Sequence, residues 1–180
     1  GKATTRMEVK IDSPDPQNVA GEIICRGANL MLGYYKNPEA TSQIIDVNGW
    51  LHTGDLATID IDGYVTVRGR SKNLLLTSSG QNIYPEEIES KLNNMPYVSE
   101  SLIVLQNDKL VALVYPDFDD AFAHGLQQND IANVMEENRK ELNQLLPSYC
   151  QITKVKIHFE EFEKTAKKSI KRFMYQEAKG

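Results

Sequence analysis

The sequence predicts an α+β protein in two parts, a β-rich part over residues 1–70 and a small mixed α+β part over residues 71–180. Alternating strand-like stretches fill the first part, and the order β-α-β-β-α-β describes the second. A chain of 180 residues can bury one sizeable core or two modest ones. Two small units are therefore expected.

Four stretches of the first part have the pattern of strands. Residues 7–12 alternate apolar and polar side chains, and residues 21–27 follow after a turn rich in proline. Residues 55–61 and 64–70 flank Asp62-Gly63, a pair suited to the positive φ values of a tight hairpin. A mostly β structure follows.

A short helix over residues 38–45 interrupts these strands. Asn37 is suited to the N-cap, Pro38 to the first helical position, and Glu39 to the positive end of the helix dipole. The sequence places this helix at the periphery.

The second part begins with an apolar run at residues 74–77, followed by a predicted helix over residues 84–93. Residues 101–106 and 109–115 have the pattern of strands joined by Asn107-Asp108. These segments predict a hairpin beside a helix.

The remainder of the second part is predicted as a loop, a helix and a strand. The acidic residues 116–128 have the composition of a surface connection. Asp130 can cap a helix that continues to residue 145 with one apolar stripe, and residues 153–159 form the last predicted strand.

Composition and charge exclude several classes of protein. The sequence contains no run of about 18 apolar residues, the length needed to span a bilayer. Residues 1–6 lack the apolar core of a secretion signal, so a cytoplasmic setting is expected. A net charge of −5 argues against binding to nucleic acid. Cys25, Cys150 and the three histidines are scattered, so no protein-only metal site is expected.

Three short motifs occur in a fixed order between residues 50 and 89. Residues 50–55 read W-L-H-T-G-D, residues 69–72 read G-R-S-K, and Gly80 precedes P-E-E-I-E at residues 85–89. Their order and spacing resemble the C-terminal signature of adenylate-forming enzymes, the superfamily of acyl-CoA synthetases, luciferases and peptide-synthetase adenylation domains. Residues 21–41 also resemble the G-E-I…R-G…G-Y-x-x-x-P-E-x-T element of acyl-CoA synthetases.

The resemblance gives each part a place in a larger enzyme. Residues 1–70 correspond to the β-rich C-terminal subdomain of the large AMP-binding domain, and residues 71–180 to the small mobile C-terminal domain. By the same resemblance, Asp55 binds the ribose hydroxyls of ATP and of the acyl adenylate, and Arg70 contacts the same sugar. A carboxylate can accept both protons of a diol, although an isolated T-G-D is more often a turn with a solvated aspartate.

Two further positions take roles from the resemblance. Lys72 matches the hinge at which the two domains rearrange between the half-reactions; the alternative is an exposed linker lysine. Gly80 lies in a polar loop that the resemblance puts beside the pantetheine channel for CoA. The loop lacks G-x-x-x-x-G-K-[ST], so it is not a phosphate-binding loop.

Residues 164–172 read K-T-A-K-K-S-I-K-R and resemble the family pattern K-T-x-x-G-K-I-x-R. The catalytic lysine of the pattern falls on Ser169 and the preceding glycine on Lys168. Loss of such a cation costs about 3–4 kcal/mol of transition-state stabilisation. Either Lys168 supplies the charge after a local register shift, or the parent enzyme makes its adenylate poorly. A solvated basic tail is the third interpretation.

The resemblance implies the C-terminal part of an ATP-dependent acyl-CoA synthetase, with fatty acids as the expected substrates. ATP, CoA and Mg²⁺ would be bound mainly through parts of the enzyme outside this chain, so the fragment alone is expected to be inactive. An adenylation domain that loads a carrier protein is one alternative. A non-catalytic regulatory or docking module is another, and Ser169 favours it.

Overall fold

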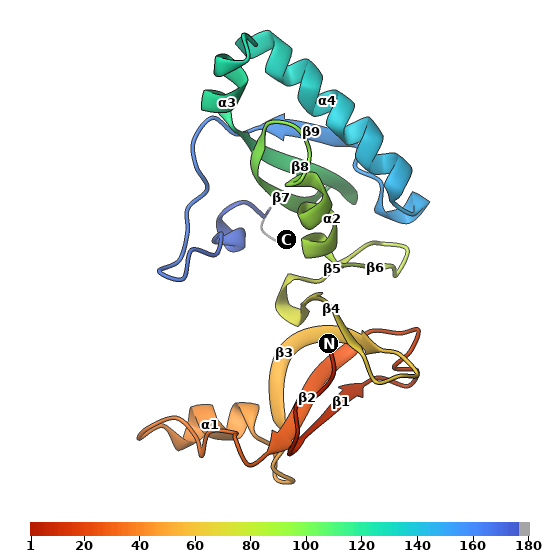
Figure 1. The fold of residues 1–180 in the computed structure, drawn as a ribbon, viewed down its shortest axis with the longest axis vertical. Helices are drawn as coiled ribbons and strands as arrows, with labels where there is room; N and C mark the ends of the chain where they lie inside the picture. Colours follow the sequence, from red (N-terminus) through yellow and green to blue (C-terminus); the bar gives the residue numbers. More distant parts are fainter. Residues whose placement is uncertain (177–180) are drawn as a thin grey trace. The chain divides into compact units, whose positions relative to one another are not determined.

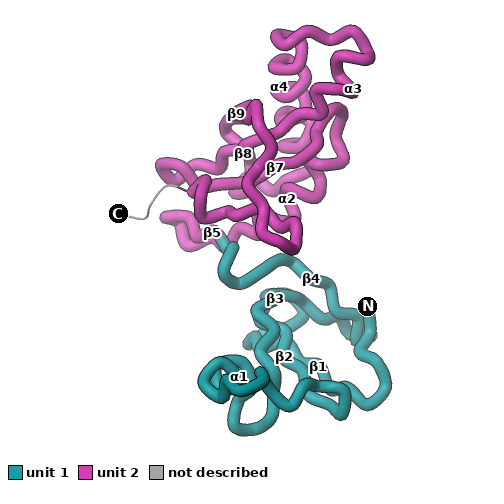
Figure 2. The backbone as a smooth tube through the Cα atoms, turned by 90° about the vertical axis from the view of Figure 1, so that its left-hand side faces the viewer, with its two compact units in different colours: residues 1–74 teal, residues 75–180 magenta. Residues whose placement is uncertain are grey.

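The computed structural model describes residues 1–176 and separates the chain into two compact units, residues 1–74 and residues 75–180 (Figure 2). The division falls between Leu74 and Leu75, whereas the sequence predicts it after Arg70. Both units contain strands and helices, so the fold class is α+β as predicted (Figure 1). Across residues 1–176, no helix combines the length and apolar character that a bilayer span requires.

A four-stranded antiparallel sheet forms the first unit. Its order is β1-β2-β3-β4, with strands β1 (Met7–Asp12), β2 (Gly21–Gly27), β3 (Leu51–Ile59) and β4 (Val65–Arg70). Strand β3 begins before the predicted start at residue 55, so it includes the whole T-G-D segment. Helix α1 (Pro38–Ile44) starts as predicted, because the Asn37 side chain accepts a hydrogen bond from the backbone N–H of Ala40 at 3.0 Å.

The turn between β3 and β4 differs from the predicted tight hairpin. Gly63 has a φ of +82°, but Asp62 does not take a positive φ. The Asp60 carboxylate accepts hydrogen bonds from the backbone N–H groups of Asp62, at 3.0 Å, and Tyr64, at 2.8 Å. This aspartate supports a longer turn over residues 60–64, in which only the glycine position requires the left-handed conformation.

Two sheets and the longer helices form the second unit. Strands β5 (Leu75–Leu76) and β6 (Asn82–Ile83) pair with each other, and helix α2 (Pro85–Leu92) follows. The larger sheet has the order β7-β8-β9, with β7 (Val98–Gln106) antiparallel and β9 (Lys154–Ile157) parallel to β8 (Lys109–Pro116). Asn107 and Asp108 form the predicted turn, with φ values of +47° and +58°.

Residues 116–128 are not a simple loop, which corrects the sequence prediction. Helix α3 (Phe118–Ala123) forms there, capped by the Asp117 side chain on the backbone N–H of Asp120. Helix α4 (Gln128–Leu145) starts before the predicted residue 130, because Gln127 is its N-cap and Asp130 completes a capping box from inside the first turn. Asp130 does take part in capping this helix, but from the third helical position and not as the N-cap. Short 3-10 turns η2 (Ser148–Cys150) and η3 (Arg172–Met174) follow.

Both faces of the larger sheet are covered. Helices α2 and α4 pack on one face, where the fully buried side chains include Ile103, Ala112 and Val114. On the opposite face, the C-terminal segment places Phe162, 2% exposed, over a row of apolar strand residues: Leu102, Val104, Val111 and Leu113. Burial on both faces explains why β8 is apolar almost throughout and does not alternate.

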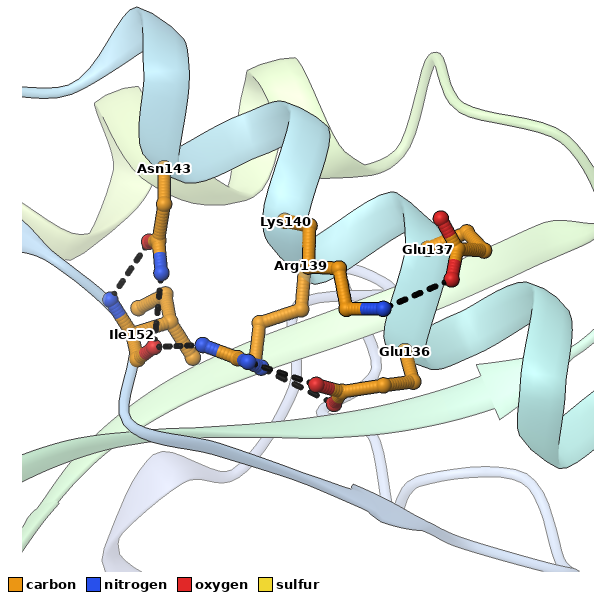
Figure 3. Close-up of polar contacts among 6 residues, drawn as sticks. All are labelled: Glu136, Glu137, Arg139, Lys140, Asn143 and Ile152. Carbon is orange, nitrogen blue, oxygen red and sulfur yellow. Dashed lines mark hydrogen bonds and ion pairs between the residues drawn. The ribbon is translucent and has the colours of Figure 1, made fainter.

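Helix α4 fixes the start of β9 through polar contacts with Ile152 (Figure 3). The Asn143 amide donates to the Ile152 carbonyl at 2.9 Å and accepts from its backbone N–H at 2.7 Å. Arg139 donates to the same carbonyl at 2.8 Å and pairs with Glu136. These contacts satisfy the backbone N–H and C=O groups of Ile152, which lies just before β9 and outside its strand pairs. They also position the chain to run parallel to β8.

Candidate functional site

Asp55 and Arg70 lie side by side on neighbouring strands of the first sheet. They are direct partners in the β3–β4 register, and Arg70 Nε lies 2.8 Å from Asp55 Oδ1. Arg70 also donates to the Thr53 carbonyl at 3.4 Å. The side chains are 34% exposed for Asp55 and 52% for Arg70, so both reach solvent. The structure therefore brings together the two residues predicted to contact one sugar, as an accessible carboxylate beside a guanidinium.

Strand β2 holds the backbone that carries Asp55. Thr53 Oγ1 donates to the Ile23 carbonyl at 2.8 Å and accepts from the Asp55 N–H at 3.1 Å. Glu22 Oε1 accepts from the N–H of Gly54 at 2.7 Å, and Gly54 has a φ of +73°. The left-handed conformation explains the glycine at this position.

Glu22 is a site residue that the sequence analysis did not identify. Its second oxygen, Oε2, lies 2.8 Å from Nδ1 of His52. The hydrogen bond that His52 makes to the Glu22 carboxylate raises the pKa of His52 above its ordinary value, against the opposing effect of burial. Glu22 appeared in the sequence only within the G-E-I element, and the distance of 32 residues to Gly54 hides the contact.

Lys72 lies in the short 3-10 turn η1 (Ser71–Asn73), between β4 and the division of the chain after Leu74. Its side chain is exposed. The turn is closed by a hydrogen bond from the Leu74 N–H to the Ser71 carbonyl at 3.3 Å. Because the turn is short and the Lys72 side chain is exposed, Lys72 remains a candidate hinge residue.

Gly80 lies in a compact loop between β5 and β6. The N–H of Gly80 donates to the Thr77 carbonyl at 2.9 Å, and Thr77 N–H donates to the Gln81 carbonyl at 3.2 Å. Gly80 has a φ of +79°, and a Cβ built on it would have no neighbour within 4 Å. The backbone around Gly80 is thus open to the approach of another molecule.

Lys168 and Ser169 lie in a tight hairpin near the end of the described chain. Lys164 and Ile170 pair as an antiparallel bridge. Within the turn, Thr165 N–H donates to the Ser169 carbonyl at 2.8 Å and Lys168 N–H to the Thr165 carbonyl at 2.9 Å. Lys168 has a φ of +61°, the conformation that the glycine of the family pattern would favour.

Two ion pairs attach the segment that carries this hairpin to the rest of the second unit. Lys164 Nζ lies 2.8 Å from Glu100 Oε1, and the hydrogen bond with Glu100 raises the pKa of Lys164. Arg172 binds Glu89 with both arms of its guanidinium, one at 2.8 Å. The Glu89 carboxylate also accepts from the N–H of Ile103 at 2.7 Å. The hairpin is anchored at both ends.

Asp55 and Arg70 are in contact, whereas Gly80 and Lys168 lie on two different loops of the second unit. Within residues 1–176, no group of three or more His, Cys, Asp or Glu side chains is arranged to hold a metal ion.

Comparisons with known proteins agree with these motifs. The family model described as AMP-binding enzyme C-terminal domain matches residues 72–178. A 3-[(3aS,4S,7aS)-7a-methyl-1,5-dioxo-octahydro-1H-inden-4-yl]propanoyl:CoA ligase of Rhodococcus jostii is 44% identical over 104 residues, which cover 58% of this chain and 19% of the relative. A 2-succinylbenzoate–CoA ligase of Bacillus cytotoxicus is 45% identical over 94 residues, covering 52% of this chain and 19% of the relative.

Among solved structures, the O-succinylbenzoate coenzyme A synthetase of Bacillus subtilis in complex with AMP is similar, with a TM-score of 0.76. It is 25% identical and covers 99% of this chain and 35% of its own. The matched segments make up between about a fifth and just over a quarter of the curated relatives, from 19% to 28% of their length.

Proposed function

Because the chain belongs to the AMP-binding enzyme family through its C-terminal domain, we propose that it forms the C-terminal part of an ATP-dependent acyl-CoA synthetase. In the first half-reaction, a carboxylate attacks the α-phosphate of ATP and forms an acyl adenylate with release of pyrophosphate. In the second, the thiol of CoA attacks the adenylate, forms a thioester and releases AMP. Matched relatives named as CoA ligases support this assignment.

The observation that carries the proposal is the Asp55–Arg70 pair. Arg70 engages Oδ1 at 2.8 Å and thereby fixes the orientation of an accessible carboxylate. In the proposal, Asp55 accepts the two hydroxyl protons of the ribose and Arg70 supplies a second contact to the sugar. Glu22 and Thr53 hold the supporting backbone in place.

Exposed apolar side chains of the first unit support a larger parent polypeptide. Four large apolar residues are at least 84% exposed: Leu32, Tyr35, Val47 and Ile61. Burial of such surface is favourable by about 25 cal/mol per Å², so further polypeptide is expected to cover part of it. In the proposal, that polypeptide holds the acid, Mg²⁺ and most of ATP, and the chain alone is inactive.

Fatty acids are the first substrate class to test, with CoA as the acceptor. Two relatives are named for 2-succinylbenzoate and for a ring-bearing propanoate. The panel of acids to be tested should therefore include aliphatic and aromatic acids. A carrier-loading adenylation domain would form the adenylate but release no thioester with free CoA. Ser169, at the place of the catalytic lysine, favours a third candidate, a non-catalytic module.

The test is Asp55→Asn in the full-length enzyme that contains this chain, measured by ATP–pyrophosphate exchange. Loss of hydrogen bonds to a charged acceptor is expected to lower kcat/KM for ATP about 10- to 100-fold. Asp62→Asn, on an exposed turn of the same unit, is the matched control and should keep wild-type activity. Equal activities of both variants would overturn the assignment of Asp55.

A further inference from the structure

A hydrogen-bonded contact joins the Gly80 loop to a distant turn of the same unit. The Asp108 carboxylate accepts from the backbone N–H of Ser78 at 2.8 Å, and the Ser78 hydroxyl donates to its second oxygen. Thirty residues separate the partners. The Asp108 side chain therefore accepts two hydrogen bonds from Ser78, which restrain both the backbone and the side-chain rotamer of Ser78.

This contact attaches the exposed tip of the loop to a part of the unit outside the β5–β6 hairpin. The loop's internal bonds link Thr77 to Ser79, Gly80 and Gln81, so they close the loop on itself. The flanking strands β5 and β6 have two residues each and supply few ladder bonds. The buried side chains of Leu75 and Ile83 hold the base of this hairpin in the core, and Asp108 supplies an attachment point for the exposed tip of the loop.

The requirements of the β7–β8 turn do not explain the carboxylate. Asn107 and Asp108 both have positive φ, and glycine at the second position of such a turn is preferred over aspartate. Asp108 is exposed, and the hydrogen bonds from Ser78 lower the pKa of its carboxyl. The contact with Ser78 therefore gives the carboxylate a structural role that the turn itself does not require.

We propose that Asp108 is a positioning residue for the acceptor step, which holds the Gly80 loop in the shape that admits the thiol-bearing chain of CoA. This inference rests on the proposed function, because only that function gives the loop an acceptor. Gly80 leaves the backbone open, and a loop that pivots would present that opening in a wrong orientation. The adenylate-forming step does not require this contact.

The test compares Asp108→Gly and Ser78→Ala with Asn107→Gly. Asp108→Gly preserves the turn and removes the carboxylate, whereas Asn107→Gly changes the same turn and keeps the carboxylate. Hydrogen exchange of loop residues 77–81 in the 180-residue chain should accelerate about threefold to tenfold in the first two variants. The Asn107→Gly loop should exchange as in the wild type.

In the full-length enzyme, the same two variants should raise KM for CoA about threefold to tenfold in the thioester step. Pyrophosphate exchange should stay at the wild-type rate. Unchanged loop exchange, or equal losses in both half-reactions, would overturn the positioning role of Asp108. A wild-type enzyme that adenylates but makes no thioester with CoA would overturn the proposed function and this inference, whatever the loop exchange shows.

Discussion

Glu89 on α2 and Arg172 near the end of the described chain form a two-point ion pair between residues 83 positions apart. The side chains are only 9% and 15% exposed. Burial raises the pKa of the Glu89 carboxyl, and the Arg172 guanidinium and the Ile103 N–H oppose that shift. The pair fixes the segment that carries the 164–170 hairpin against the helix.

Removal of either partner of this pair should destabilise the second unit. An uncompensated buried charge costs about 3–5 kcal/mol, so Arg172→Ala should lower the urea midpoint measured by circular dichroism. The same variant should raise the pKa of Glu89 further, as measured by carboxyl NMR. Lys140→Ala is the control, because the Lys140–Glu137 pair is exposed to solvent and should contribute little to stability. Similar midpoints for both variants would contradict the importance of the buried pair.

Stability of the first unit should depend on the charge of His52. The hydrogen bond with Glu22 raises the pKa of His52 above 6.5. The pair therefore contributes its full stabilisation below pH 6.5, and this contribution is lost as pH rises through the folded pKa. Histidine NMR titration should give a pKa above 6.5 in the wild type and a value closer to 6.5 in Glu22→Gln. Titration at the same pH in both proteins would contradict the contact.

Lys168→Gly should stabilise the 164–170 hairpin. A non-glycine residue in the left-handed region costs about 1–2 kcal/mol, and glycine loses about 0.5–1 kcal/mol through the entropy of the unfolded chain. A net gain of about 0.5–1 kcal/mol is expected in urea unfolding. Lys167→Gly is the control, because Lys167 has no positive φ to relieve, and it should lose stability.

Other variants of the same hairpin test its role in the chemistry of the full-length enzyme. If Lys168 supplies the cation for the adenylate-forming step, Lys168→Ala lowers pyrophosphate exchange about a hundredfold or more, and Lys167→Ala does not. Ser169→Lys restores the lysine of the family pattern and should raise the rate. Equal, small losses from the two alanine variants would exclude Lys168 from the step, and no gain from Ser169→Lys would favour the non-catalytic module.

Local sequence determined most of the secondary structure, because caps, turns and alternation act within a few residues. Asn37 and Pro38 start α1 as predicted, and Asn107-Asp108 form the expected turn. At the start of α4, both Gln127 and Asp130 take part in capping, and the sequence alone did not show which of them is the N-cap. Gln127 is the N-cap, and Asp130 lies inside the first turn. The family motifs likewise depended only on the order and spacing of residues.

Tertiary structure alone decided which of these residues meet. Asp55 and Arg70 had the right chemistry, but the β3–β4 register put their side chains 2.8 Å apart. The contacts of Glu22 with Gly54 and of Asp108 with Ser78 span 32 and 30 residues, and no periodic pattern encodes such distances. Likewise, the C-terminal segment covers β7 and β8 because both faces of that sheet are apolar and both must be removed from water.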